Sequence, residues 1–443
     1  MLQRNANRQY SRATIEHCQI SCVGSPTAVW VYRQRVNCTQ LNIAFVVLHT
    51  SPLDEPGTKD AGGMNVVVLA QAAELARLGH RVRLITRRSD PAQPDEVEIE
   101  PGLTVHHLDA GPARLLAKGE HEALIEPFGA ALRAHLEGRD TDVLHAEHWY
   151  SGLAALPAAR ELGIALVQSY HSIAAAAHTP LGHGERPEAP GRLEGERRLA
   201  SEADLVITVS EAEKRTVLDR LGGDPARVRV VWPGVNTELF RPCGGQECEE
   251  RSAWLEHGGR PEVLVAGRLD PLKRFDLAIA AVAEIDPSRR PLLRIVGAPP
   301  PDGEAYARSL HEAVADASML ATTSFDGALR RSELAARLRV ATIVLVPSHS
   351  ETYGLVALEA AASGVPVIAS RTGGLCEAVV DGETGVLIAS DDPLVWAAEI
   401  ERLLGDPERE ARMGAAARDH ALQHSWQAST ARLVDVYLEL LGR

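Results

Sequence analysis

Short runs of valine, isoleucine and leucine alternate with longer segments rich in alanine, leucine, arginine and glutamate along most of the chain. The apolar runs are continuous, which is typical of parallel strands that are buried on both faces. Parallel strands need a long crossover between them, and the intervening helical segments supply it. The sequence therefore predicts an α/β protein with doubly wound parallel sheets.

This alternation occurs in two blocks. The first begins at Leu41 with LNIAFVVLH and continues through the helical segment NVVVLAQAAELARLG to the strands RVRLIT, DVLHAEH, IALVQSYH and ADLVITVS. It pauses in a polar, glycine-rich bridge between Phe240 and Glu256, and then resumes with EVLVAGRL, PLLRIVGA, TIVLVPS and VPVIAS. A chain of 443 residues is too long for one ordinary core. We therefore expect two Rossmann-like domains with a cleft at the carboxyl ends of their strands.

The pattern also suggests where the domains begin and end. The first forty residues show no sustained period of 2 or 3.6, so they are predicted to be a disordered extension. The last predicted helix, WQASTARLVDVYLELL, is amphipathic and is expected to pack across both domains. The expected parts are the extension 1–40, an N-terminal domain 41–240, a linker 241–259, a C-terminal domain 260–424 and the helix 425–443.

Composition excludes several classes of function. A net charge of -14 disfavours a nucleic-acid or anionic membrane surface, because such surfaces need clustered lysine and arginine. No apolar run approaches the length of a membrane span and no signal-peptide core is present, so a cytoplasmic protein is expected. The six cysteines match no metal motif and are interpreted as free thiols. No metal or cofactor is expected, and a homodimer is left open.

The stretch VAGRLDPLKRFD places two cations, Arg268 and Lys273, just after a predicted strand. A departing nucleoside diphosphate carries about two negative charges, which fixed cations can stabilise without a metal. A solvated basic turn beside Asp270 and Asp276 is the alternative. No G-x-G-x-x-G follows the first strand, so a dinucleotide site is disfavoured.

The stretch PSHSETYGLVALEAAASGVPVIAS adds two glutamates to this edge of the second sheet. The helix expected to begin near Gly354 would direct unpaired N–H groups at a phosphate, and a glycine there permits close approach. Glu351 could accept hydrogen bonds from sugar hydroxyls, and Glu359 could reach a ribose diol. The alternatives are a helix-capping acid at Glu351 and a surface charge at Glu359. Gly373 and Gly374, in TGGLCEAVVDGETG, are explained by turn formation or by shaping of a base pocket.

The first block offers a second group of candidates. DAGGMN is a glycine loop that opens a helix and could close over a phosphate, presenting Asn65 to an acceptor. His171 follows a predicted strand end, where a structural or a binding role is equally open. Lys118, Arg192 and Arg197 could hold an anionic acceptor or be scattered surface bases.

Taken together, these motifs closely resemble the retaining glycosyltransferases of family 4, which have the GT-B fold of two facing Rossmann-like domains. The set consists of GRLDPLKRFD, the E-x7-E stretch SETYGLVALE, and TGG followed by DGETG. Within that family, HTSPLDEPGTKDAGGMN looks most like the enzymes that place N-acetylglucosamine on inositol phosphate in mycothiol biosynthesis. The likeness runs from about Leu41 to the C-terminus.

The resemblance implies a nucleotide-sugar donor, UDP- or GDP-linked, and a small polar acceptor, handled without a metal. Four residues would act in catalysis: His171, Arg268, Lys273 and Glu351. The implied donor-binding residues are Gly63, Arg268, Lys273, Glu351, Gly354, Leu355 and Glu359. The implied acceptor-binding residues are Asn65, Lys118, His148, Ser172 and Arg192.

Some positions depart from the family pattern. His148 stands where a tyrosine is expected, Ser172 where a threonine is expected, and Glu147 where a histidine is expected. Leu329 occupies the place of a further donor-site arginine, with Arg330 and Arg331 displaced. The sequence therefore leaves two alternatives to transfer onto inositol phosphate. One is an antibiotic-pathway enzyme that joins a GDP-sugar to the sulfur of ergothioneine, as in lincosamide assembly. The other is a GT-B nucleotide-sugar epimerase.

Overall fold

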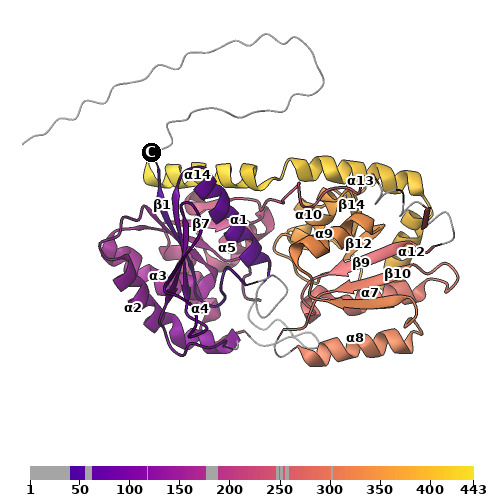
Figure 1. Cartoon of the computed structure of the whole chain (residues 1–443), viewed down its shortest axis with the longest axis horizontal. Helices are drawn as coiled ribbons and strands as arrows, with labels where there is room; N and C mark the ends of the chain where they lie inside the picture. Colours follow the sequence, from indigo (N-terminus) through magenta and orange to yellow (C-terminus); the bar gives the residue numbers. More distant parts are fainter. Residues whose placement is uncertain are drawn as a thin grey trace, which may run out of the picture. The chain divides into compact units, whose positions relative to one another are not determined.

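The computed structural model describes residues 40–54, 62–116, 118–175, 188–245, 249, 253–254, 259–300 and 303–443. Gln40–Arg443 belong to one unit, within which two sheets are distinguished (Figure 1). Of the predicted extension, only its last residue, Gln40, lies within the described part.

The first sheet has eight strands among the described residues, in the order β3-β4-β2-β1-β5-β6-β7-β8. Every neighbouring pair is parallel except β3 and β4, which pair antiparallel at the edge. The strands are β1 (Asn42–Val47), β2 (Arg81–Arg87), β3 (Glu96–Glu100), β4 (Leu103–Leu108), β5 (Val143–Glu147), β6 (Ala165–Ser169), β7 (Leu205–Thr208) and β8 (Val228–Val230).

Helices cover both faces of this sheet, which is why its central strands are apolar on both sides. In β1, Ile43 and Phe45 pack into the core on one face, while Ala44 and Val46 pack into the core on the other. The helical elements are α1 (Gly63–Arg77), η1 (Lys118–Leu124), α2 (Ile125–Leu136), α3 (His148–Leu162), α4 (Arg192–Glu202), α5 (Glu211–Leu221) and η2 (Pro225–Arg227). We refer to this part as the N-terminal domain.

The second sheet is parallel throughout and has six strands in the described part, in the order β11-β10-β9-β12-β13-β14. Its strands are β9 (Glu262–Ala266), β10 (Leu292–Val296), β11 (Thr323–Gly327), β12 (Ile343–Val346), β13 (Val367–Ser370) and β14 (Gly385–Ile388). Its helices are η3 (Pro271–Lys273), α7 (Phe275–Glu284), α8 (Glu304–Asp316), α9 (Arg331–Val340), α10 (Leu355–Ala362), α11 (Leu375–Ala378) and α12 (Pro393–Leu404). This is the C-terminal domain.

Two helices, yellow in Figure 1, end the chain. α13 (Pro407–Leu422) packs against α10 in the C-terminal domain. α14 (Trp426–Leu441) packs against α1 and buries Leu433 and Tyr437 in the core of the N-terminal domain. Ser425 caps α14 by accepting a hydrogen bond from Ala428 N, which ends the turn between the two helices. The chain thus returns to the domain in which it began.

The strands and helices quoted in the sequence analysis are all present, and the prediction of two parallel doubly wound sheets is confirmed. The edge strands β3, β8 and β11, and β4 next to β3, were not predicted. The interpretation of every cysteine as a free thiol is wrong at Cys243, which is disulfide-bonded, and correct at Cys376, which is free and exposed. Sequence spacing does not show which loop brings two sulfurs within bonding distance.

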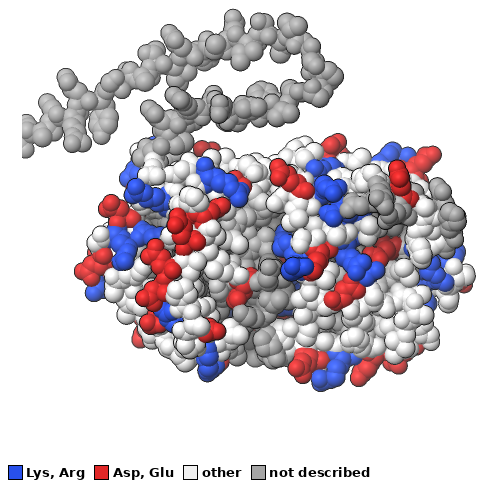
Figure 2. Space-filling view, viewed as in Figure 1, with Lys and Arg blue, Asp and Glu red and all other residues white. Residues whose placement is uncertain are grey.

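Acidic and basic side chains are interspersed on the face shown in Figure 2. Among the described residues, none of the helices combines the length and the apolar character that a membrane span requires.

Candidate active site

The predicted donor residues lie at neighbouring strand ends of the C-terminal domain. β9 and β12 are adjacent and parallel, so the loops that follow them emerge at the same edge of the sheet. The two loops are joined by a hydrogen bond from His349 N to Leu272 O of 2.8 Å. Lys273 Nζ, from the first loop, lies 2.5 Å from Glu351 Oε2, from the second. The structure therefore brings together two residues that the sequence places 78 positions apart.

Glu351 is held by more than this lysine. Ser348 Oγ donates to the same carboxylate oxygen at 3.1 Å. α10 is preceded by Gly354, and no side-chain hydrogen bond caps this helix, so Glu351 is not a capping acid in this structure. The capping alternative is therefore disfavoured.

Glycines fix the loop that carries Glu351. Gly354 has φ of 105°, a left-handed conformation that residues with a side chain rarely adopt, and a Cβ there would lie 2.5 Å from Leu375 Cδ2. Gly373 and Gly374 lie so close to the loop that a Cβ on either would stand 2.1 Å from Glu351 O or 2.2 Å from Thr352 O. Both glycines thus shape the loop between β12 and α10, which carries Glu351, by permitting close backbone packing. We refer to this loop as the donor loop, after the predicted role of Glu351.

Glu359 lies on α10 and is 2% exposed, so it is not the surface charge of the alternative interpretation. Its Oε1 accepts from Arg331 Nη1 at 2.6 Å, whereas its Oε2 is buried and has no hydrogen-bond partner in the part of the chain that the structure describes. Burial raises the pKa of this carboxyl, and the Arg331 charge opposes that effect. A buried, half-satisfied carboxylate is a ready acceptor for a ligand hydroxyl.

Arg331, which the sequence analysis treated as displaced, contacts Glu359, one of the predicted donor residues. Its guanidinium lies 4.7 Å from the centroid of the Phe240 ring and bonds Glu359. Arg268, at the end of β9, lies 3.7 Å from Asp270 and is one-third exposed. Arg268 therefore precedes Lys273 in the chain, and Arg331 lies between Lys273 and Glu351.

Two N-terminal candidates lie at the start of α1. Gly63 faces the donor helix: a Cβ there would lie 3.2 Å from Leu355 Cδ1. Asn65 is 2% exposed, and its amide donates to Thr50 Oγ1 at 3.2 Å and Ser51 O at 2.7 Å while accepting from Gly62 N. Asn65 thus joins the loop after β1 to the start of α1.

His171 follows β6 and adopts φ of 58°. Its ring Nε2 lies 2.5 Å from Glu147 Oε2, and its backbone oxygen accepts from Thr352 Oγ1 of the donor loop at 2.8 Å. The predicted His171 is therefore adjacent to the donor loop. Glu147, which stands where the family pattern has a histidine, is its direct partner.

The predicted acceptor residues are not equally available. Arg192 is 3% exposed, and its guanidinium donates to Glu196 Oε1 and Glu188 Oε2, each at 2.8 Å, and to Ser172 Oγ at 3.0 Å. Two carboxylates therefore already neutralise this arginine. His148 begins α3 with φ of 70° and lies 4.4 Å, ring to ring, from a histidine at the end of β1. The side chain of Lys118 lies outside the described residues.

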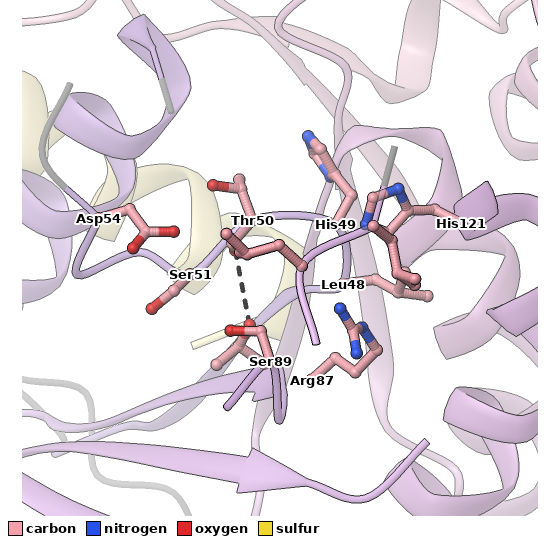
Figure 3. A pocket seen from close by; sticks show the side chains of 11 residues that line it. Leu48, His49, Thr50, Ser51, Asp54, Arg87, Ser89 and His121 are labelled. Atoms are coloured by element: carbon pink, nitrogen blue, oxygen red, sulfur yellow. Dashed lines mark hydrogen bonds between the residues drawn. The ribbon is translucent and has the colours of Figure 1, made fainter. Parts of the chain in front are cut away.

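A pocket opens beside this group at the carboxyl ends of β1 and β2 (Figure 3). It is polar on several sides, and Asn65 and His148 touch its lining through Thr50 and His49. The lining residues are Leu48, His49, Thr50, Ser51, Asp54, Thr86, Arg87, Ser89, Leu115, Leu116 and His121.

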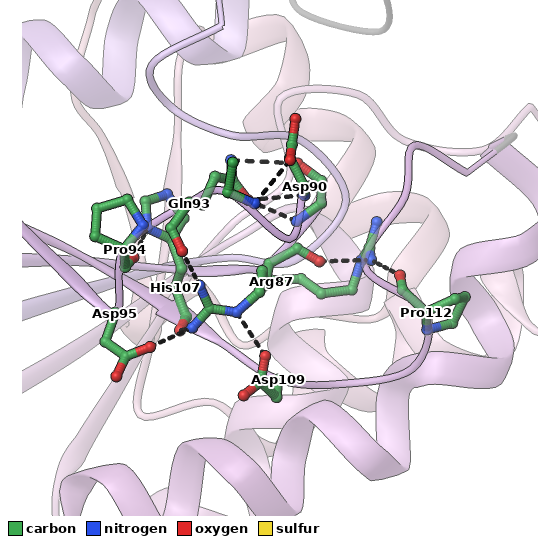
Figure 4. A network of polar contacts seen from close by, with 11 residues as sticks. Arg87, Asp90, Gln93, Pro94, Asp95, His107, Asp109 and Pro112 are labelled. Carbon is green, nitrogen blue, oxygen red and sulfur yellow. Dashed lines mark hydrogen bonds and ion pairs between the residues drawn. The ribbon is translucent and has the colours of Figure 1, made fainter.

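Two successive arginines at the end of β2 have contrasting partners (Figure 4). Arg88 is paired with the carboxylates of Asp95 and Asp109. Arg87 is 4% exposed and donates to three backbone oxygens, those of Arg88, Pro112 and Arg114. Carbonyl groups satisfy hydrogen bonds but do not cancel a charge, so Arg87 brings positive potential to the pocket.

Sequence reasoning missed Glu147, Arg331 and Arg87 as members of these groups. Each directly follows or lies in a predicted strand end or helix start, but its partner is distant in sequence. The strand-end rule pointed to the right edge of each sheet; only the tertiary structure shows which side chains meet there.

Solved structures with a similar fold define the class of protein. Sucrose-phosphate synthase from Thermosynechococcus elongatus superimposes with a TM-score of 0.82 at 29% identity, covering 91% of this chain and 100% of that one. The Anabaena protein HepE, solved in complex with UDP-glucose, has a TM-score of 0.70 at 20% identity and covers 90% of this chain and 100% of its own. Two Rossmann-like domains in this arrangement are the GT-B glycosyltransferase fold.

Sequence comparison then gives the family. Residues 61–239 match Glycosyltransferase Family 4, and residues 246–420 match Glycosyl transferases group 1. Relatives named D-inositol 3-phosphate glycosyltransferase are similar over nearly the whole chain: that of Kineococcus radiotolerans is 39% identical over 89% of this chain and 94% of its own length, and that of Frankia alni 38% identical over 89% and 98%. The chain belongs to glycosyltransferase family 4.

Proposed function

We propose that this glycosyltransferase moves a sugar from a nucleotide-diphosphate donor to a small polar acceptor with retention of anomeric configuration and without a metal. The observation that carries the proposal is the meeting of Lys273, Glu351 and the start of α10 at one edge of the C-terminal sheet, with Glu359 one helix turn further on. HepE is solved with UDP and with UDP-glucose, which supports a nucleotide sugar as donor.

The charges at this edge suit a departing diphosphate. Lys273 and Arg268 would stabilise the negative charge that develops on the leaving phosphate, and the first N–H groups of α10 would add the positive end of a helix dipole. These cations replace a metal in the proposal. In a retaining reaction of this type, the acceptor attacks from the face that the diphosphate leaves, and the leaving oxygen takes the acceptor proton. No flanking pair of catalytic carboxylates is required, in contrast to a glycosidase.

The remaining donor contacts follow from satisfaction of hydrogen bonds. Glu359 Oε2 has no partner among the described residues and would accept from a ribose hydroxyl. Glu351 would accept from a hydroxyl of the transferred sugar while it orients Lys273. Gly63 has no side chain and packs against Leu355, so its backbone could approach the diphosphate closely.

Inositol 3-phosphate is the first acceptor to test, because the relatives that are 38–39% identical carry that name. The Arg87 guanidinium beside the pocket, whose hydrogen bonds go to backbone oxygens, favours an acceptor with an anionic group. A second candidate is an acceptor without phosphate, such as ergothioneine with a GDP-sugar. The neutralisation of Arg192 by Glu188 and Glu196 favours it, because this arginine would otherwise hold the phosphate.

The test is a two-stage screen. UDP- and GDP-sugars are first ranked by the thermal shift they cause, and each donor that binds is then assayed for transfer to inositol 3-phosphate and to ergothioneine, with and without EDTA. Proton NMR of the first product gives its anomeric configuration. We expect transfer with retention that EDTA does not reduce. An inverted product, loss of activity in EDTA, or epimerisation of the donor without acceptor would overturn the corresponding part of the proposal.

The cytoplasmic location stays a prediction from the sequence.

A further inference from the structure

A buried carboxylate, Glu147, ends β5 next to the donor loop. It is 1% exposed and lies between two histidines: Oε2 is 2.5 Å from His171 Nε2, and Oε1 is 3.6 Å from His145 Nε2. A carboxylate buried without a cation is strongly unfavourable, so one of these histidines must carry a positive charge if Glu147 is ionised.

His145 is satisfied as a neutral ring. Its Nδ1 lies 2.6 Å from Tyr437 Oη and its Nε2 lies 2.8 Å from Ser169 Oγ, and both hydroxyl groups can donate or accept. The side chain is 1% exposed, and burial lowers its pKa. His145 therefore has no need of a second proton.

His171 is the better cation. Burial alone would lower its pKa, but the charge of Glu147, the hydrogen bond to Glu147 and the nearby Glu213 together raise it. Burial alone would raise the pKa of Glu147, but the charges of His145 and His171 and the hydrogen bond with His171 lower it. The titratable groups that face this pair from the packed elements are His145 on β5, Glu213 on α5 and Tyr437 on α14.

The contacts of His171 with Glu147 and Thr352 fix the orientation of its other ring nitrogen, Nδ1. Its backbone is fixed by the bond from Thr352 Oγ1, so the ring stays beside the loop that carries Glu351. The described part of the chain gives this ring a hydrogen bond through Nε2, to Glu147, and none through Nδ1. In an imidazolium both nitrogens donate, whereas a neutral ring that donates through Nε2 would present Nδ1 as an acceptor.

We propose that Glu147 is a positioning residue that holds His171 as an imidazolium and so presents its Nδ1–H to an oxygen of the bound donor sugar. This rests on the proposed function, because the ligand is the donor assigned to that site. Glu147 itself touches no substrate. Its effect is to keep the ring in one orientation and one protonation state through neutral pH.

The test compares wild type with Glu147→Gln. Glutamine keeps the size and can still accept from Nε2, but it has no charge. The pH profile of kcat/KM should fall on the alkaline side as His171 loses its proton, and this limb should move to lower pH by about one unit or more in Glu147→Gln. The loss of activity should then be about tenfold larger near pH 8 than near pH 6. A merely structural role would reduce activity by the same factor at both.

Two controls separate charge from packing. Glu147→Asp should restore the alkaline limb, and Tyr437→Phe, which removes a bond of His145 only, should leave the limb in place. Thermal unfolding and UDP affinity of each variant report whether it is folded.

A readout independent of turnover completes the design. In selectively labelled wild-type protein, the ¹⁵N shifts of His171 should report an imidazolium at neutral pH, and its titration should move downward in Glu147→Gln. A neutral His171 in wild type, or an identical titration in both proteins, would overturn the proposal. If the titration behaves as expected while no nucleotide sugar is bound or transferred, the charge pair stands, and the proposed function and the role toward the donor are rejected.

Discussion

At the scale of single residues, two of the predicted donor residues form an ion pair. Lys273 and Glu351 are 2.5 Å apart and only partly exposed, which holds both side chains in one orientation. A donor phosphate can join this pair because an ammonium has three donors. The site is thus pre-oriented, which lowers the entropy that binding must overcome.

Replacing Lys273 with alanine should remove the cation that meets the leaving phosphate and leave Glu351 without its partner. We expect transfer to fall by about 100-fold or more, as for other single groups that stabilise transition-state charge. Initial rates at saturating donor measure this. Lys214→Ala is the matched control. Lys214 lies on α5 of the N-terminal domain, where its Nζ is 3.7 Å from Glu211 Oε2. Turnover retained in Lys273→Ala would contradict the assigned role.

Glu213 should make stability depend on pH. It is fully buried on α5, and burial raises its pKa to about 7, against the bond it accepts from Val209 N. A carboxyl whose folded pKa is raised stabilises the fold below its unfolded value of 4.5 and loses that contribution as pH rises through about 7. In the wild type, the ionisation of Glu213 should lower the free energy of unfolding by up to about 3 kcal/mol between acidic and alkaline pH. In Glu213→Gln this decrease should be absent. Urea unfolding at a series of pH values measures it. An unchanged pH slope would show that the pKa of Glu213 is the same in the folded and unfolded states.

At the scale of elements, the turn into α10 decides where its N–H groups point. Gly354→Ala would place a side chain at φ of 105° and against Leu375. We expect a stability loss of about 1–3 kcal/mol and a clear loss of donor affinity, because the helix start must shift. Gly222→Ala is the control: it has φ of 76° with open space around it, so it should lose stability but keep UDP affinity. Calorimetric titration with UDP distinguishes them, and equal affinities in both variants would exclude a role for this turn.

The end of β2 offers a comparison between neighbours. Arg87→Gln should raise the KM for an anionic acceptor by about 10-fold or more, because it removes a positive charge beside the pocket. Arg88→Gln should affect stability instead, because Arg88 joins Asp95 and Asp109. Comparing inositol phosphate with inositol as acceptors separates the two effects. A loss in Arg87→Gln that is equal for both acceptors would indicate a structural arginine.

Most of the fold could be predicted from the sequence, because parallel strands that are buried on both faces consist of continuous apolar runs. The edge strands β3 and β11 could not, because EVEIE and TSFDG are only half-buried and carry charge. For the site, the rule of strand ends located Lys273, Glu351 and His171. It could not reveal that Arg192 is neutralised within its own domain or that Arg331 meets Glu359, because both depend on how helices pack.

At the scale of the whole molecule, the two domains are joined by polar contacts as well as by the turn between α13 and α14. Glu377, on α11 of the C-terminal domain, accepts from the backbone N–H groups of Glu211 and Ala212 at the start of α5, at 2.9 and 3.0 Å. It also accepts from Trp232 Nε1 at 2.9 Å. A carboxylate at a helix N-terminus is favoured by the helix dipole, so one domain satisfies the helix end of the other.

Glu377→Ala should weaken this junction without touching the donor. Two helix N–H groups and an indole N–H would exchange a carboxylate for water, at a cost of about 1–2 kcal/mol. We expect a lower midpoint of thermal unfolding and a broader calorimetric transition, because the domains unfold with less coupling, while UDP affinity at the C-terminal domain stays near that of wild type. Glu383→Ala, an exposed acid in the turn after α11, is the control and should change neither. If Glu377→Ala unfolds like wild type but loses UDP affinity, Glu377 acts on the donor site and not on the junction between the domains.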